Sequence, residues 1–347
     1  MRERKFRLAA GKCLISIFFG LMALPYTGAF SEYNVYEKTD IGLIRLYDNI
    51  VRHSSATDGI VGVGIIHLET GRELYLNRSE RFPMASTVKI PVAVQLMKLV
   101  DQGRIHLDSM ITIRRNDFSP GSGVIKYQSA AGERISVRHL LNTMLTISDN
   151  SATDIIFRTV GGPSAVQKTM RSAEIYGMSV DRPIYLVLSN IWGVKDLKED
   201  DPFSIPLLRQ MMAKVTREER AEARRQFMTD DRDTSTPEAM AKLLEKIWRQ
   251  DILSPQSSQT ILDIMAQSHG NRRIKGLLPE GTKVYHKTGT IRGGLSDVGI
   301  VEMPNDAGNL VVVVFVKGGT KPINTAEQTM ALIARDAFDY FLNSGAD

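Results

Sequence analysis

Residues 80–92 read ERFPMASTVKIPV, and the tetrad S-T-V-K at residues 86–89 is the only S-x-x-K in the chain. The apolar pattern around it continues to Gly103 and predicts a long helix that begins at the serine. A helix that starts there places Lys89 one turn beyond Ser86 on the same face. A serine hydroxyl becomes a nucleophile when a nearby base takes its proton, and a buried amine can be that base. The stretch therefore predicts a nucleophilic Ser86 with Lys89 as its base.

Two further polar motifs follow along the chain. S-D-N at residues 148–150 lies between two helical patterns, where these residue types alone indicate a helix N-cap. K-T-G-T at residues 287–290 lies on an expected strand, where alone it indicates a strand that runs into a turn. The three motifs occur in order on a helix start, an interhelical loop and an edge strand. This combination favours one catalytic cleft built from all three.

The remaining pattern predicts a mixed α/β fold of the α+β type. Strand patterns occur towards both ends of the chain, whereas the middle reads as helices. We expect an antiparallel sheet flanked by N- and C-terminal helices, with an all-helical lobe inserted. One catalytic domain, about 33–347, would contain an α/β lobe from about 33–105 and 270–347, and a helical lobe from about 106–269.

The N-terminus predicts export. A basic segment, residues 1–12, precedes a short apolar run that ends at Leu24, and small residues follow up to Ala29. The run is shorter than the ~20 residues of a membrane span. We therefore interpret residues 1–29 as a cleaved signal peptide, with an uncleaved anchor as the alternative, and expect a periplasmic or secreted protein without a stable membrane span. The leader carries +4 of the formal net charge of +5 and the only cysteine, Cys13, so the mature chain gives no sign of a nucleic-acid-binding face.

With these motifs the chain resembles the class A β-lactamases and related penicillin-binding proteins, which carry S-x-x-K, S-D-N and K-T-G. The likeness extends over TISDNSATDIIFRTVGGP around the second motif and RDTSTPEAMAKLLEKI further on, and it implies a β-lactamase/transpeptidase-like fold. By this resemblance Ser86 attacks the substrate carbonyl, and Lys89 acts as base or proton relay. Ser148 passes a proton to the leaving nitrogen, and Lys287 supplies positive charge beside it. The N–H groups of Ser86 and Thr290 form the oxyanion hole.

The resemblance also implies the residues that bind substrate. Asn150 would bind the substrate's side-chain amide. Thr288 and Thr290, on either side of Gly289, would lie near the substrate carboxylate. Phe118 resembles the aromatic residue that lines the entrance to the site, and its alternative is a simple core aromatic.

The sequence departs from the family in the Ω-loop, where class A enzymes carry the glutamate that activates the deacylating water. The neck of that loop is held by an Arg and Asp pair, which corresponds here to Arg182 and Asp233. These two residues enclose an enlarged insertion, about 183–232, and we hypothesise that it folds over the site as a lid. The position of the glutamate corresponds to Ile184, which cannot accept a proton.

Three functions stay open from the sequence. The favoured one is a serine hydrolase that opens β-lactam amide bonds through an acyl-enzyme on Ser86. A cell-wall peptidase or other serine amidohydrolase would share the acylation machinery, and a penicillin-binding sensor would be acylated without turnover. The six histidines lack metal-ligand spacing, so we expect no metal and no cofactor. The expected partner is a small-molecule β-lactam or a cell-wall peptide, and the expected state is a monomer.

Overall fold

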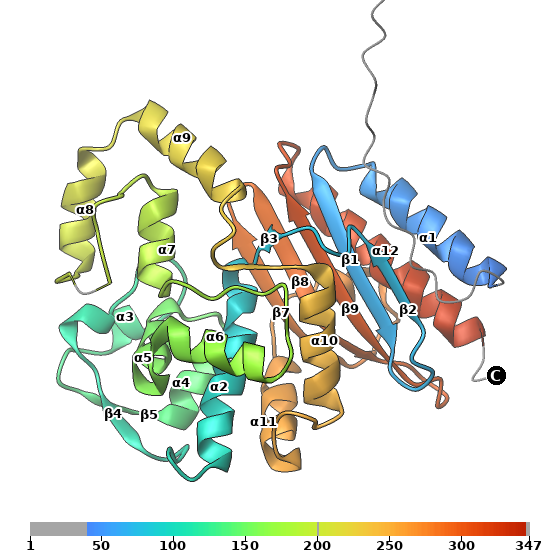
Figure 1. Cartoon of the computed structure of the whole chain (residues 1–347), viewed down its shortest axis with the longest axis horizontal. Coiled ribbons are helices and arrows are strands. Elements are labelled where there is room, and N and C mark those ends of the chain that lie inside the picture. The colour runs from blue at the N-terminus through green and yellow to red at the C-terminus, as the bar shows by residue number, and fades with distance from the viewer. Residues whose placement is uncertain (1–39, 200, 345–347) are drawn as a thin grey trace, which may run out of the picture. The chain divides into compact units, whose positions relative to one another are not determined.

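The computed structural model describes residues 40–199 and 201–344, and the expected signal peptide lies outside them. A five-stranded antiparallel sheet in the order β2-β1-β9-β8-β7 forms the centre of the fold (Figure 1). Its strands are β1 (Ile60–His67), β2 (Glu73–Leu76), β7 (Val284–Ile291), β8 (Gly294–Glu302) and β9 (Asn309–Lys317). Because β1 pairs with β9 along its whole length, both ends of the chain contribute to one sheet. The α+β class expected from the sequence is confirmed.

Strand β9 lies between two apolar cores. Its sequence, NLVVVVFVK, is apolar at nearly every position, and successive side chains of a strand point to opposite faces. Val312 packs in the core formed with α1 (Ile41–Ser54) and α12 (Ile323–Asn343). Val313, the next residue, packs in the larger core on the other face. A strand buried on both faces therefore reads as a continuous apolar run rather than as an alternation.

The larger core joins the sheet to the helical region. The longer helices there are α2 (Lys89–Asp101), α4 (Val137–Thr146), α5 (Asn150–Val160), α6 (Gly162–Ser172), α10 (Pro237–Trp248) and α11 (Pro255–Met265). The short elements are η1 (Ala85–Val88), η2 (Arg115–Asp117), α3 (Ile125–Gln128), η3 (Ile274–Leu277), and the paired strands β3 (Phe82–Pro83) with β6 (Thr234–Ser235) and β4 (Met110–Thr112) with β5 (Arg134–Ser136). Strands this short show no periodicity, which is why the sequence pattern indicated only helices. Helices α10 and α11 pack directly on the sheet, so the helical region covers one of its faces.

The segment 183–232, expected from the sequence to be an enlarged Ω-loop insertion, is itself helical. It contains α7 (Ile184–Ile191), α8 (Ile205–Ala213) and α9 (Arg217–Met228). Apolar side chains from this segment, including Tyr185 and Phe203, form a small core of their own. The insertion is therefore a packed subdomain that starts at the neck of the loop.

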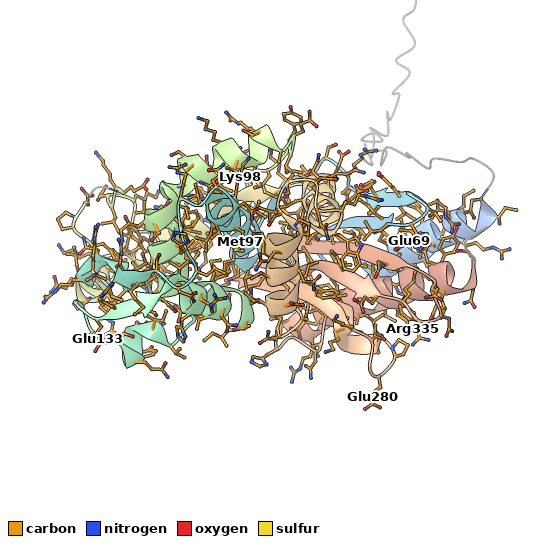
Figure 2. The ribbon with its side chains drawn as sticks, turned by 90° about the horizontal axis from the view of Figure 1, so that it is seen from below. Glu69, Met97, Lys98, Glu133, Glu280 and Arg335 are labelled. Atoms are coloured by element: carbon orange, nitrogen blue, oxygen red, sulfur yellow. The ribbon has the colours of Figure 1, made fainter. Side chains whose placement is uncertain are left out.

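The view from below shows the helical region beside the sheet region (Figure 2). Glu133 lies on the helical side, Glu280 and Arg335 lie on the sheet side, and the buried Met97 of α2 lies between them. Of the residues the structure describes, none belongs to a helix both long and apolar enough to cross a membrane.

Candidate active site

Ser86 lies in the 3₁₀ turn η1, which leads directly into α2. Lys89 is the first residue of α2, and its Nζ lies 3.2 Å from Oγ of Ser86. Ala85 has a φ of +49°, a left-handed backbone conformation that is uncommon for a residue with a side chain. Strain of this kind costs of order 1–3 kcal/mol and is concentrated at functional sites. The turn therefore presents the Ser86 hydroxyl at a helix start, beside an amine.

The amine of Lys89 is fully buried among oxygen atoms. Besides Ser86, its Nζ contacts the carbonyl oxygen and Oγ of Ser148, both at 3.0 Å, and Oδ1 of Asn150 at 2.8 Å. Burial lowers the pKa of Lys89 well below its ordinary value, and the positive charge of Lys287 lowers it further. A lowered pKa increases the fraction of neutral amine, which is the form that accepts a proton from a hydroxyl.

The loop between α4 and α5 fixes Ser148, whose φ is +60°. Asp149 is the N-cap of α5, and one of its carboxylate oxygens accepts the N–H of Ala152 at 2.9 Å. The other oxygen accepts the N–H groups of Val124 and Ile125 at 2.6 and 2.9 Å. Asp149 thus also binds the segment at the start of α3 to this loop. The S-D-N motif, residues 148–150, therefore serves both as the cap of α5 and as part of the site.

Strand β7 forms the opposite wall of the site. Lys287 is buried, and burial lowers its pKa to about 8 against the opposing effect of the charge on Asp297. A Cβ built on Gly289 would lie 2.8 Å from the carbonyl oxygen of Met84 and 3.0 Å from the backbone nitrogen of Ser86. Only glycine permits such a close approach of two backbones. The three motifs therefore converge on one site.

Arg273 adds a buried guanidinium group beside β7. Its Nη1 donates to the carbonyl oxygens of Gly289 and Ser296 at 2.8 and 2.9 Å, and its Nη2 donates to Oγ1 of Thr290 at 2.8 Å. An ion pair at 3.3 Å joins it to Glu327. No motif in the sequence indicates this residue, because it stands beside a second arginine in a loop that reads as exposed. Only its place against the folded sheet distinguishes it.

Comparisons with known proteins show the family of this chain. A family model described as the β-lactamase enzyme family matches residues 45–341. The chain belongs to the β-lactamase enzyme family. The β-lactamase VEB-1 of Pseudomonas aeruginosa is 26% identical over 343 residues, which cover 96% of this chain and 99% of VEB-1. The extended-spectrum β-lactamase PER-1 of the same organism is 29% identical over 307 residues, which cover 85% of this chain and 86% of PER-1.

A solved structure of PBP-A matches to a similar extent. It is an acyl-enzyme complex of a leucine-to-glutamate mutant with penicillin G, with a TM-score of 0.70 and 25% identity. The match covers 86% of this chain and 97% of PBP-A. Together, these comparisons confirm the resemblance to the class A β-lactamases and the expected fold.

In this β-lactamase-family enzyme, Arg182 and Asp233, the residues expected from the sequence to form the neck of the Ω-loop, pair with each other. Both side chains are buried, and Nε of Arg182 lies 2.6 Å from Oδ2 of Asp233. The other oxygen of Asp233 accepts the backbone N–H of Asp181 at 2.8 Å and that of Arg182 at 3.0 Å. Nη1 of Arg182 also donates to Oδ1 of Asn190 at 2.8 Å, so Asn190 is part of the neck.

Ile184 is the first residue of α7, and its side chain lies in the main core. Its N–H donates to Oδ1 of Asp154 at 2.7 Å, and the N–H of Tyr185 donates to Oδ2 at 3.1 Å. The hydroxyl of Ser119 donates to the same carboxylate. Burial raises the pKa of Asp154 to about 6. Asp154 therefore holds the start of α7, and Ile184 contributes no group that could activate water.

Phe118 and His286 make none of the contacts between the three motifs described above. Phe118 is half-buried and packs against the main core. His286 is buried in the sheet, with Nδ1 2.9 Å from the carboxylate of Asp297. Over the described parts of the chain, no group of three or more His, Cys, Asp or Glu side chains is arranged to hold a metal ion.

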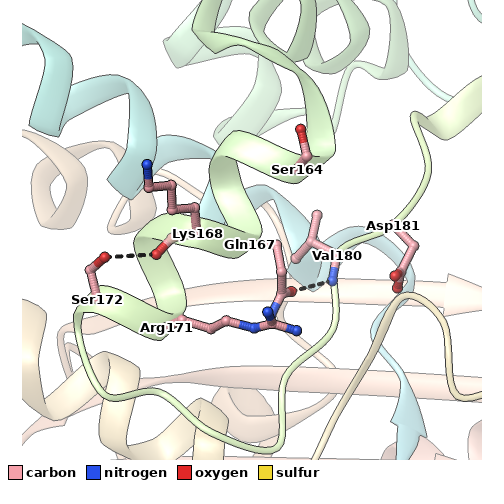
Figure 3. A pocket seen from close by; sticks show the side chains of 7 residues that line it. All are labelled: Ser164, Gln167, Lys168, Arg171, Ser172, Val180 and Asp181. Carbon is pink, nitrogen blue, oxygen red and sulfur yellow. Dashed lines mark hydrogen bonds between the residues drawn. The ribbon is translucent and has the colours of Figure 1, made fainter.

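A separate depression of about 550 Å³ lies against α6, away from the motifs (Figure 3). It is lined by residues that include Lys168, Arg171 and Asp181. Oε1 of Gln167 accepts the N–H of Val180 at 2.8 Å and thereby joins the helix to the loop beside it. Because no residue of the three motifs lines this depression, it is not part of the active site.

Proposed function

We propose that this β-lactamase-family enzyme hydrolyses β-lactams through an acyl-enzyme on Ser86. One observation carries the proposal: the buried amine of Lys89 lies 3.2 Å from Oγ of Ser86 and 3.0 Å from Oγ of Ser148. Acylation of an amide requires that the nucleophile lose a proton and that the leaving nitrogen gain one. An amine in contact with two hydroxyls connects these two transfers.

Acylation begins with neutral Lys89. As Oγ of Ser86 bonds to the β-lactam carbonyl carbon, its proton passes to Nζ of Lys89. The carbon–nitrogen bond then breaks while Ser148 gives its proton to the ring nitrogen and takes one from Lys89. The N–H groups of Ser86 and Thr290 stabilise the oxyanion, and each such donor is worth about 3 kcal/mol. Lys89 is neutral again when the acyl-enzyme forms.

The charges around β7 favour a substrate with a carboxylate on the side of the leaving nitrogen. Lys287 is positively charged below its pKa of about 8, and Arg273 adds a second buried positive charge beside Thr290. We assign the carboxylate to Lys287, Thr288 and Thr290. Nδ2 of Asn150 uses one N–H for the carbonyl oxygen of Pro120 at 2.8 Å, which leaves its second N–H for the side-chain amide of the substrate.

Deacylation requires a base for water, and Ile184 cannot serve. The carboxylates whose charges act on Lys89 are Asp154 and Asp149, and N–H donors occupy both. We therefore assign this role to Lys89 as well. Water gives a proton to the neutral amine and attacks the acyl carbon, and Oγ of Ser86 leaves and regains the proton from Lys89.

The relatives support this activity. VEB-1 and PER-1 are named as β-lactamases, and the PBP-A mutant forms an acyl-enzyme with penicillin G. An exported enzyme with this activity would protect cells from β-lactam antibiotics. We propose that residues 1–29 direct this export and are then cleaved. The intact mass of the secreted or periplasmic protein should therefore correspond to a chain without these residues. An intact mass of the full-length chain would contradict cleavage.

Incubation with a chromogenic cephalosporin tests the proposed function, with absorbance and intact mass followed over time. We expect repeated turnover and a transient adduct on Ser86. Ser86→Ala should form no adduct, and Lys89→Met should acylate slower by several orders of magnitude, because Ser86 loses its proton acceptor. A permanent adduct without turnover would instead indicate a penicillin-binding sensor. Lack of any adduct would favour a peptidase or another amidohydrolase.

A further inference from the structure

A cavity of about 860 Å³ lies between the insertion helix α9 and the β7–β8 hairpin. Thr290 and Ile291 line it from β7, and Arg224 and Met228 line it from α9. A Cβ built on Gly293 would lie 3.6 Å from Sδ of Met228, so the helix and the hairpin are in close contact. Figure 1 shows α9 reaching the end of the sheet where β7 turns into β8. Thr290 is the last residue of the K-T-G-T motif, so the cavity lies at the end of β7 that borders the candidate site, beside the insertion.

The cavity wall carries unpaired positive charge. Arg224 and Arg292, the latter at the tip of the hairpin, both line it, and Arg220 lies one turn earlier on α9. Burial lowers the pKa of Arg224, and the charges of Arg292 and Arg220 lower it further. Within residues 40–199 and 201–344, no acceptor bonds to the buried Nε of Arg224, and neither Arg224 nor Arg292 forms an ion pair.

The other charged groups of the cavity already have partners. The carboxylate of Asp58 accepts the N–H groups of Thr320 and Lys321 at 2.9 and 3.1 Å. Lys321 donates through Nζ to a backbone carbonyl oxygen. The exposed Arg225 pairs with Glu222 at 2.5 Å. Arg224 and Arg292 are therefore the guanidinium groups of this cavity that have no acidic partner among the described residues.

We propose that Arg224 and Arg292 bind a carboxylate on the acyl side chain of the substrate. A planar guanidinium group can donate two parallel hydrogen bonds to a carboxylate, and a second guanidinium in the same cavity adds charge. Like-charged arginines without an acidic partner repel one another, and a bound anion relieves this repulsion. The enlarged insertion thus adds a second anion-binding position to the site.

The orientation of the bound substrate, on which this proposal depends, rests on the proposed function. Along β7, Lys287 lies first and takes the carboxylate on the leaving-nitrogen side. Thr290 follows and donates to the scissile carbonyl oxygen, and Arg292 lies beyond it. A substrate aligned in this order directs the group on its acyl carbon towards the hairpin and α9.

Carbenicillin and benzylpenicillin provide the test, because they differ by one carboxylate on the acyl side chain. Isothermal titration of the Ser86→Ala variant, which cannot be acylated, measures the Kd of each penicillin without turnover. We expect carbenicillin to bind about tenfold more tightly, as a charge-assisted hydrogen bond allows. In the same background, Arg224→Gln and Arg292→Gln should each remove most of this preference and leave benzylpenicillin binding nearly unchanged.

Arg217→Gln is the matched control, because Arg217 lies on the same helix, is exposed and does not line the cavity. This variant should keep the preference for carbenicillin. Equal Kd values for the two penicillins, absence of binding, or a preference that survives both Arg224→Gln and Arg292→Gln would overturn the proposal. Should Arg224→Gln unfold, Arg292→Gln on the exposed hairpin provides the same test. Failure of the proposed function is seen separately, as the absence of an adduct on Ser86 in the unmodified protein.

Discussion

Gly289 lies so close to Ser86 that a methyl group on Gly289 would come within 3.0 Å of the backbone nitrogen of Ser86. The same methyl group would lie 2.8 Å from the carbonyl oxygen of Met84 and closer still to Oγ of Ser296. All three neighbours belong to β8 or to the segment that carries the nucleophile. Strand β7 can therefore accept a side chain here only by moving away from Ser86.

Gly289→Ala should consequently lower kcat/KM about 100-fold, because a displacement of roughly 1 Å is enough to misalign a nucleophile and its oxyanion donors. Overpacking should also cost about 1–3 kcal/mol of unfolding free energy. Gly276→Ala is the control, since the nearest neighbours of a Cβ there are Cβ of Ala331 at 3.2 Å and the carbonyl oxygen of Asn271 at 3.5 Å, neither of which belongs to a motif. Stopped-flow acylation and thermal unfolding measure the two effects. Acylation of Gly289→Ala at the unmodified rate would show that β7 need not approach so closely.

The two active-site lysines should shape the pH dependence of kcat/KM, which reports the free enzyme. Lys89 acts as the neutral amine, so activity should rise with pH through its lowered pKa. Lys287 acts as a cation, so activity on a carboxylate-bearing β-lactam should fall above about pH 8, where Lys287 loses its proton. Rates from pH 5 to 10 at constant ionic strength test this. Activity that keeps rising beyond pH 9 would contradict the assigned role of Lys287.

The parts of the site that depend on local geometry could be predicted from the sequence. The spacing of Ser86 and Lys89 determines their contact once a helix begins there, because one helical turn separates them. The capping preference of Asp149 likewise follows from residue type and position. The sheet could be predicted because β-branched and apolar runs near both chain ends are long enough to show a pattern.

The remaining features depend on contacts between distant segments. Arg273 and Arg292 look like ordinary loop arginines until the sheet places one under β7 and the other against α9. Asp154 reads as one polar residue of a helix, yet it becomes the acceptor for the start of α7. A single sequence does not show which charged residues of a loop become buried, since burial is set by the partner element.

Asp154 should make stability depend on pH in an identifiable way. Its pKa is raised to about 6 from 3.8, so between these values the folded protein holds a proton that the unfolded chain has lost. Stability should therefore fall as pH rises from about 4 to 6, by up to about 3 kcal/mol for this group. Asp154→Asn removes the titration and should flatten this part of the curve. Urea unfolding of both proteins from pH 4 to 7 gives the difference, and parallel curves would contradict the prediction.

The neck of the Ω-loop should depend on its ion pair far more than a surface helix depends on one. Arg182→Ala leaves the buried carboxylate of Asp233 without its cation and should cost about 3–5 kcal/mol of unfolding free energy. Arg335→Ala, which breaks a half-exposed pair with Asp339 at 2.7 Å, should cost less than about 1 kcal/mol. Because the neck holds α7 and the insertion, Arg182→Ala should also increase hydrogen exchange of residues 184–191 before global unfolding. Urea titrations and hydrogen exchange measured by mass spectrometry give the two results. Similar losses of unfolding free energy in the two variants, or unchanged exchange at α7, would mean that the insertion is held in place by its own packing rather than by this pair.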